Sequence, residues 1–144
     1  GTPIQGGIVT LHHSPELTVL KVIWTPGMSI YPHDHRMWAV IGIYGGREDN
    51  TFYRRSEEGL TRVGFRELET RDAAVLGNEV IHAVTNPEQR FTGAIHIYGG
   101  DFFSEPRSEW DPVTFKERPY DIENVMQQYE IANERLNKGH PASN

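Results

Sequence analysis

Short runs of apolar residues alternating with polar ones follow each other along most of the chain. They are rich in β-branched and aromatic side chains, as strands are, and Gly, Pro, Asn or charged residues separate them. The runs cover residues 17–24, 37–45, 50–55, 72–77, 80–86 and 91–100. Before Asp121 no segment combines a sustained helical period with capping signals. The pattern therefore predicts an all-β sandwich or barrel.

The C-terminal part of the chain has a different pattern. Apolar residues recur there at helical spacing, and Asp121 is suited to cap the first turn. The face expected to pack on the barrel carries Ile122, Val125, Met126, Tyr129 and Leu136. At 144 residues we expect one domain, 1–144, with the barrel at about 8–118 and a C-terminal α-helix at about 121–137.

Composition narrows the kinds of partner. The chain has 14 Lys and Arg against 20 Asp and Glu, a net charge of −6 with no basic stripe, so nucleic acid and membranes are not expected partners. Cysteine is absent, which excludes disulfides, thiolate ligands and a cysteine nucleophile. No apolar run approaches roughly 20 residues, and the N-terminal GTPIQGG lacks signal-peptide features. We expect a cytoplasmic protein that acts on a small molecule, and the oligomeric state stays open.

Histidines form the most informative polar pattern. His33 and His35 are two residues apart, so on a strand their imidazoles share a face while Asp34 points away. His82, roughly fifty residues later and beside another strand-like run, is a candidate third ligand. Three neutral imidazoles on one side of a divalent ion leave other positions open, as in catalytic sites. The sequence thus predicts a metal site made of His33, His35 and His82.

Glycines and an asparagine accompany these histidines at fixed spacing: Gly27-x5-His33-x-His35 followed by Gly46, and Gly77-x4-His82-x3-Asn86. This arrangement resembles the two motifs of the cupin superfamily, which implies a double-stranded β-helix, a jelly-roll barrel. Within the cupins it is most similar to the thiol dioxygenases, the cysteine dioxygenase and aminoethanethiol dioxygenase group, which hold iron with three histidines. Their first motif lacks the usual glutamate ligand, and here Ala39 and Val40 stand in that place.

A later strand strengthens the resemblance. Cysteine dioxygenase has a Ser-x-His-x-Tyr strand whose tyrosine reaches the ligands of the iron, and Ala94, His96 and Tyr98 occupy those positions. The chain also resembles cysteine-dioxygenase-like bacterial proteins described as predicted metal-dependent enzymes of the double-stranded β-helix superfamily. The resemblance implies catalytic roles for Tyr98 and for His96, which would hold the tyrosine hydroxyl. Strand alternation alone also allows the reverse, with Ile95 and Ile97 inside and the polar pair in solvent.

Two features of cysteine dioxygenase are missing. Its arginine for the substrate carboxylate lies on a strand before the His-x-His pair, but the matching segment here has no Arg or Lys before Lys21. Its tyrosine-crosslinked cysteine is replaced by Val40. Arginines 47, 54 and 55 lie in a run typical of a solvated hairpin. The identity of the substrate is therefore open.

The resemblance implies an oxidoreductase, a non-haem Fe(II) dioxygenase that uses O2 to convert a small thiol to its sulfinate. Iron is the expected metal, although three imidazoles also suit Zn, Ni or another divalent ion in purified protein. Two other classes stay open. One is a cupin oxygenase or isomerase acting on a non-thiol such as a diketone or a sugar. The other is a non-catalytic ligand-binding cupin with a structural metal.

Overall fold

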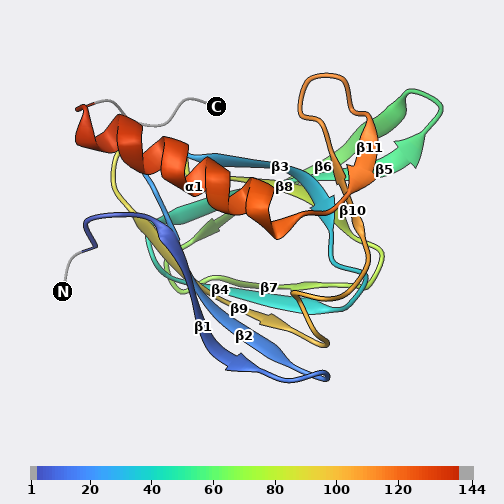
Figure 1. Cartoon of the computed structure of the whole chain (residues 1–144), viewed down its shortest axis with the longest axis horizontal. Helices are drawn as coiled ribbons and strands as arrows, with labels where there is room; N and C mark the ends of the chain where they lie inside the picture. The colour runs from blue at the N-terminus through green and yellow to red at the C-terminus, as the bar shows by residue number, and fades with distance from the viewer. Residues whose placement is uncertain (1–2, 140–144) are drawn as a thin grey trace.

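Two antiparallel β-sheets and one helix make up the computed structural model, which describes residues 3–139 (Figure 1). The elements are β1 Gly7–His13, β2 Thr18–Trp24, β3 Ser29–Asp34, β4 Ala39–Gly45, β5 Arg47–Ser56, β6 Gly59–Glu69, β7 Ala73–Leu76, β8 Ile81–Thr85, β9 Thr92–Tyr98, β10 Ser108–Trp110, β11 Glu117–Pro119 and α1 Ile122–Asn137. The expected all-β class with a C-terminal helix is confirmed.

Each sheet pairs strands that are far apart in the sequence. The five-stranded sheet has the order β1-β2-β9-β4-β7, and the six-stranded sheet has the order β11-β10-β3-β8-β5-β6. The two sheets face each other, with the five-stranded sheet in the lower part of Figure 1. Alternation along β4 shows how the core forms, because Ala39, Ile41 and Ile43 are buried and the residues between them are more exposed. The inner faces thus enclose one shared interior.

Strand β6 was not among the expected runs. Only Leu60 and Leu68 are buried along its 11 residues, so the alternation that marks a half-buried strand is nearly absent. Pairing with β5 over its whole length defines it instead. Strands β1, β3, β10 and β11 also lie outside the expected runs. Strands β10 and β11 have three residues each, too few to show a period.

Helix α1 begins after Asp121, whose side chain accepts a hydrogen bond from the backbone N–H of Glu123 at 2.9 Å. Its fully buried residues are Val125, Tyr129 and Ala132. The expectation that Met126 packs inward was wrong, because it is 37% exposed: it lies about 100° around the helix from Val125. Among residues 3–139 no helix is long and apolar enough to cross a membrane.

Three residues of the glycine and asparagine spacing pattern, Gly27, Gly46 and Asn86, lie in turns between strands. Gly27 and Gly46 have φ of 72° and 89°, in the left-handed region that favours glycine. Asn86 is fully buried, and its amide Nδ2 donates to the backbone carbonyls of Trp24, Thr25 and Arg90 at 2.9–3.2 Å. Asn86 therefore ties the turn after β8 to the turn between β2 and β3, next to the strand that carries His33.

A buried glutamate joins the six-stranded sheet to the helix. Glu109 on β10 lies opposite His33 in the β3 pairing and has no exposed surface. Its carboxylate accepts hydrogen bonds from Arg118 Nε at 2.6 Å, from the Asp121 backbone N–H at 2.8 Å and from Asn124 Nδ2 at 3.1 Å. The start of α1 is thereby held against the strand that carries a candidate ligand.

Candidate metal centre

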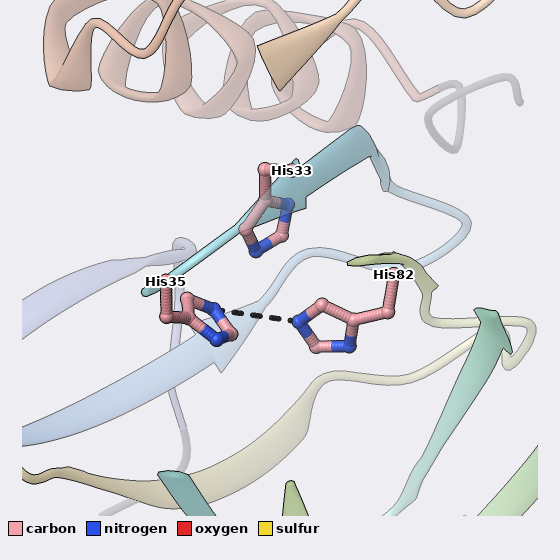
Figure 2. Close-up of side chains that lie close together, drawn as sticks. All are labelled: His33, His35 and His82. Carbon is pink, nitrogen blue, oxygen red and sulfur yellow. Dashed lines mark hydrogen bonds between the residues drawn. The ribbon is translucent and has the colours of Figure 1, made fainter. Parts of the chain in front are cut away.

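The three histidines expected as ligands come together inside the barrel. His33 on β3 lies directly opposite His82 on β8 in the antiparallel register, and His35 follows one residue after the end of β3. Figure 2 shows the three rings turned toward a common centre. One ring nitrogen of each lies within 4.8 Å of the others, and all three side chains are buried. Strand register thus assembles the group from two segments of the chain.

Hydrogen bonds fix the orientation of two of the rings. His33 Nδ1 lies 3.0 Å from the Tyr31 carbonyl, and His82 Nδ1 lies 2.7 Å from Asn50 Oδ1. Both partners are acceptors only, so each Nδ1 carries the hydrogen and leaves Nε2 with a free lone pair. His82 Nε2 approaches His35 Nε2 at 3.4 Å, the pair joined by the dashed line in Figure 2. The bare nitrogens therefore face the shared centre.

This donor set fits a divalent transition metal. Two nitrogens about 2.1 Å from one ion, at angles between a right angle and a tetrahedral one, lie about 3.0–3.4 Å apart. The 3.4 Å between the two Nε2 atoms falls within that spacing. Within the described part of the chain no carboxylate joins the group. Asp34 points away, as expected, and accepts a hydrogen bond from the Ser108 N–H at 2.8 Å. An all-imidazole site suits Fe, Zn, Ni or Cu.

Burial keeps these imidazoles neutral. It lowers the pKa of His33 to about 4, because the interior disfavours the charged ring. The pKa values of His35 and His82 are pushed well below the usual value for the same reason, and the neighbouring histidines add to the effect. All three rings are therefore in the protonation state that binds a metal at neutral pH.

His96 and Tyr98 face the same interior. They are 5% and 3% exposed, whereas Ile95 and Ile97 beside them are partly exposed, so the alternative with the polar pair in solvent is wrong. His96 Nδ1 lies 2.8 Å from the Tyr98 hydroxyl, and the Tyr98 ring centroid is 5.0 Å from that of His35. Burial raises the pKa of Tyr98 well above its usual value, so the phenol stays protonated.

A small residue leaves space for that tyrosine. Ala39, one of the two residues at the place of the usual cupin glutamate, is fully buried and lies opposite Tyr98 in the β4–β9 register. Val40, the other, is partly exposed on the outer side of β4. Where a carboxylate ligand would project, this chain has only a methyl group next to a phenol.

Glu48 on β5 was not predicted from the sequence as a site residue, and it has no exposed surface. Its Oε2 accepts hydrogen bonds from Trp24 Nε1 at 2.9 Å and from His96 Nε2 at 3.1 Å, and its Oε1 accepts from Asn50 Nδ2 at 3.1 Å. Burial alone would raise the pKa of Glu48, but His96 and these hydrogen bonds together lower it. Glu48 is therefore a buried carboxylate. Two polar residues at i and i+2, Glu48 and Asn50, were the available signal.

Arg107 is a second buried charged residue near the histidines that the sequence did not predict. Only 6% exposed, it precedes β10, and its guanidinium carbon lies 4.4 Å from the centre of the Phe102 ring and 3.8 Å from that of Tyr120. Nη1 donates to the Phe102 carbonyl, and Nε and Nη2 make no hydrogen bond of good geometry among residues 3–139, although the Tyr120 hydroxyl interacts with the guanidinium. Its charge adds to burial in lowering the pKa of His33 and of His35. No local pattern marks this loop residue.

A small cavity adjoins the histidines. Its volume is about 30 Å³, and its polar and aromatic walls are Trp24, His33, His82, His96, Tyr98, Phe102 and Tyr120. Roughly 10–15 Å³ of such space holds one water molecule, and drug-sized ligands occupy pockets of roughly 300–1,000 Å³. The site therefore accommodates a ligand of only a few heavy atoms, with some movement of the lining rings.

No protein-family model matches the chain. Solved structures with a similar fold include a cupin-family protein with a double-stranded β-helix from Methanocaldococcus jannaschii, at 8% identity and TM-score 0.57 over 69% of this chain and 84% of that one. A conserved protein of unknown function from Streptococcus pyogenes has 16% identity and TM-score 0.56 over 67% and 75%. Oxalate oxidase in complex with glycolate has 15% identity and TM-score 0.55 over 69% of this chain, which spans 53% of the oxidase. The fold is that of the cupins.

Proposed function

We propose that the protein is a non-haem iron dioxygenase that converts a small thiol carrying an anionic group to its sulfinate. The observation that carries this proposal is the three-histidine cluster with no carboxylate among the described residues, set beside the inward-facing Tyr98. A ferrous ion held by His33, His35 and His82 would lower the pKa of a thiol and activate O2. Both oxygen atoms of O2 pass to the sulfur, so the reaction needs no external reductant.

Tyr98 supplies a polar contact in a largely apolar cavity. Its hydroxyl is held 2.8 Å from His96 Nδ1, which restricts the phenol to one orientation. A group oriented in advance loses little freedom when substrate binds, and in a site with little water its hydrogen bond is strong. We infer that Tyr98 orients the reacting atoms and that His96 positions Tyr98.

The buried charge of Arg107 is the reason to expect an anionic substrate. A buried charge without a counterion costs several kcal/mol. Within residues 3–139, Arg107 Nη1 reaches only the Phe102 carbonyl, and no carboxylate pairs with Nε or Nη2. The two free nitrogens, Nε and Nη2, form the side of the guanidinium that grips a carboxylate in bidentate fashion. Arg47 and Arg55 use the same two nitrogens to hold Asp49 and Glu117, at 2.7–3.3 Å. Arg107 presents this fork without a protein carboxylate. It does not itself line the small cavity, but its charge lowers the pKa of His33 and of His35, so we infer that it binds the carboxylate of a substrate held beside these histidines.

A second candidate is an oxidase or oxygenase acting on a small carboxylate that is not a thiol. The free fork of Arg107 favours it equally, and the structural similarity to oxalate oxidase in complex with glycolate supports it. The thiol requirement is therefore the property to test first.

The test combines metal analysis of freshly purified protein with O2 consumption on three matched compounds: a thiol carboxylate, the corresponding thiol alcohol and the corresponding hydroxy acid. We expect bound iron, and fastest O2 uptake with the thiol carboxylate, one sulfinate appearing per O2 by mass spectrometry. No O2 uptake with any thiol would contradict the proposal, and uptake only with the hydroxy acid would favour the second candidate.

A substitution of Arg107 tests whether the enzyme recognises an anionic group on the substrate. Arg107→Gln should raise KM for the thiol carboxylate by about 10- to 100-fold, since hydrogen bonds to charged groups contribute about 1.5–3 kcal/mol. KM for the thiol alcohol should change little. Arg47→Gln, at the partly exposed pair with Asp49, is the matched control and should affect neither substrate. Equal effects of Arg107→Gln on both thiols would refute the carboxylate assignment.

A further inference from the structure

We propose that Glu48 is a positioning residue that determines which ring nitrogen carries the hydrogen on two histidines, His82 and His96. The proposal rests on the proposed function in that His82 is taken as a metal ligand. One carboxylate reaches both rings, His96 directly and His82 through Asn50. It thereby couples the metal ligands of the six-stranded sheet to the Tyr98 pair of the five-stranded sheet.

The first branch runs to the metal site. A carboxylate only accepts hydrogen bonds, so Glu48 Oε1 requires the Nδ2 side of the Asn50 amide, at 3.1 Å. Asn50 must then turn Oδ1 toward His82 Nδ1, at 2.7 Å. That nitrogen consequently carries the hydrogen, and Nε2 keeps the lone pair that faces His35. Glu48 thus selects the metal-binding tautomer of His82 across two hydrogen bonds.

The second branch runs to the tyrosine. Glu48 Oε2 lies 3.1 Å from His96 Nε2, which must donate, so a neutral His96 has its lone pair on Nδ1. The Tyr98 hydroxyl, 2.8 Å away, then donates to Nδ1 and leaves its oxygen lone pairs free. In this state Tyr98 presents oxygen lone pairs to the cavity, where they can accept a hydrogen bond from a ligand.

Trp24 prevents an amide from replacing the carboxylate. Its Nε1 donates to Glu48 Oε2 at 2.9 Å, and an indole has no acceptor atom to offer instead. In Glu48→Gln the introduced amide must keep its oxygen toward Trp24 and His96, so its nitrogen faces Asn50. Two donors would then meet, and Asn50 would have to turn over. Its Nδ2 would face His82 Nδ1, which would drive the hydrogen of His82 onto Nε2, the ligand atom.

The test exchanges the carboxylate and the amide between positions 48 and 50. We expect Glu48→Gln to weaken zinc binding by about 10- to 100-fold, the usual cost of losing the group that orients a ligand, measured by chelator competition. In the double variant Glu48→Gln/Asn50→Asp the introduced amide donates to the introduced carboxylate, which again accepts from His82 Nδ1. Volume and net charge are the same as in the wild type. Zinc affinity should therefore return to within about threefold of the wild type.

Nitrogen-15 NMR of the histidine side chains in the metal-free protein provides the second measurement. We expect the hydrogen on Nδ1 of His82 and on Nε2 of His96 in the wild type and the double variant, and on Nε2 of His82 in Glu48→Gln. Unchanged zinc affinity in Glu48→Gln, or no recovery in a folded double variant, would overturn the inference. If the variants do not fold, the wild-type spectrum decides, since an Nε2 hydrogen on His82 would overturn it. A wild type that binds no divalent metal but shows both expected tautomers would refute the proposed function alone.

Discussion

The two sheets contribute to the site by different physical means. The six-stranded sheet brings His33 and His82 together through the register of adjacent strands, with His35 at the end of one of them. The five-stranded sheet contributes His96 and Tyr98 from its central strand β9. His96 contacts the opposite sheet through Glu48 of β5, and Tyr98 is held by His96. The ligands thus depend on pairing within one sheet, whereas the tyrosine pair depends on contacts across the barrel.

Because of this difference, we expect some substitutions to reduce turnover without reducing metal retention. Local strand pairing should hold the three imidazoles when the β9 side of the cross-barrel contact is altered, as in variants of Tyr98. Loss of a group on β9 should affect the reaction and leave the metal in place. Changes on the two sheets therefore have distinguishable consequences.

Removal of a ligand should have the largest effect. His33→Ala, His35→Ala and His82→Ala should each abolish metal retention after dialysis, because two imidazoles hold a labile divalent ion too weakly. Metal analysis on folded protein measures this. His13→Ala is the matched control, since His13 is an exposed histidine that pairs with Asp101 and should leave metal content unchanged. Full occupancy in His82→Ala would refute the third ligand.

The variant Tyr98→Phe should distinguish most clearly between the roles of the two sheets. It removes one hydroxyl and no packing volume, so fold and metal content should survive. Turnover should fall by about 10- to 1000-fold, the range for loss of one positioned polar group. Tyr44→Phe, on the more exposed side of β4, is the control and should have no effect. If Tyr98→Phe keeps the wild-type rate on the best substrate, the β9 pair has no role in the reaction.

The pH dependence of stability tests the burial of the ligands. The pKa of His33 is about 4 in the folded protein and about 6.5 in the unfolded chain. Between these values the unfolded state binds more protons, so the free energy of unfolding of metal-free protein should decrease as the pH falls from 6.5 toward 4. His33 alone accounts for about 3 kcal/mol over that window. Urea unfolding at several pH values with a chelator present measures it.

His33→Gln is the control for that measurement. It removes one titrating group and should make the decrease less steep by about the His33 contribution. A free energy of unfolding that does not change between pH 7 and pH 4.5 would show that the imidazoles are not buried in solution. Metal affinity should fall over the same range, because protons compete with the ion for the ring nitrogens.

Much of the fold could be predicted because its signals are local. Alternation in 17–24 and 37–45 marked β2 and β4, and the Asp121 cap marked the start of the helix. The His-x-His spacing placed two candidate ligands together. The side of the helix that packs inward was predicted less well, since Met126 is apolar yet exposed, and the position of the barrel surface decides which apolar residues become buried.

The sequence by itself determined an all-β barrel with a terminal helix and a candidate three-histidine metal group, because strand period and i, i+2 spacing act over a few residues. Only the tertiary structure decided that Glu48 and Arg107 are buried beside that group. In the sequence both stand among charged residues, which is typical of solvated segments. Their burial results from β5 facing β9 across the interior and from Phe102 and Tyr120 enclosing a guanidinium. Such contacts join residues far apart in the chain, and no local pattern records them.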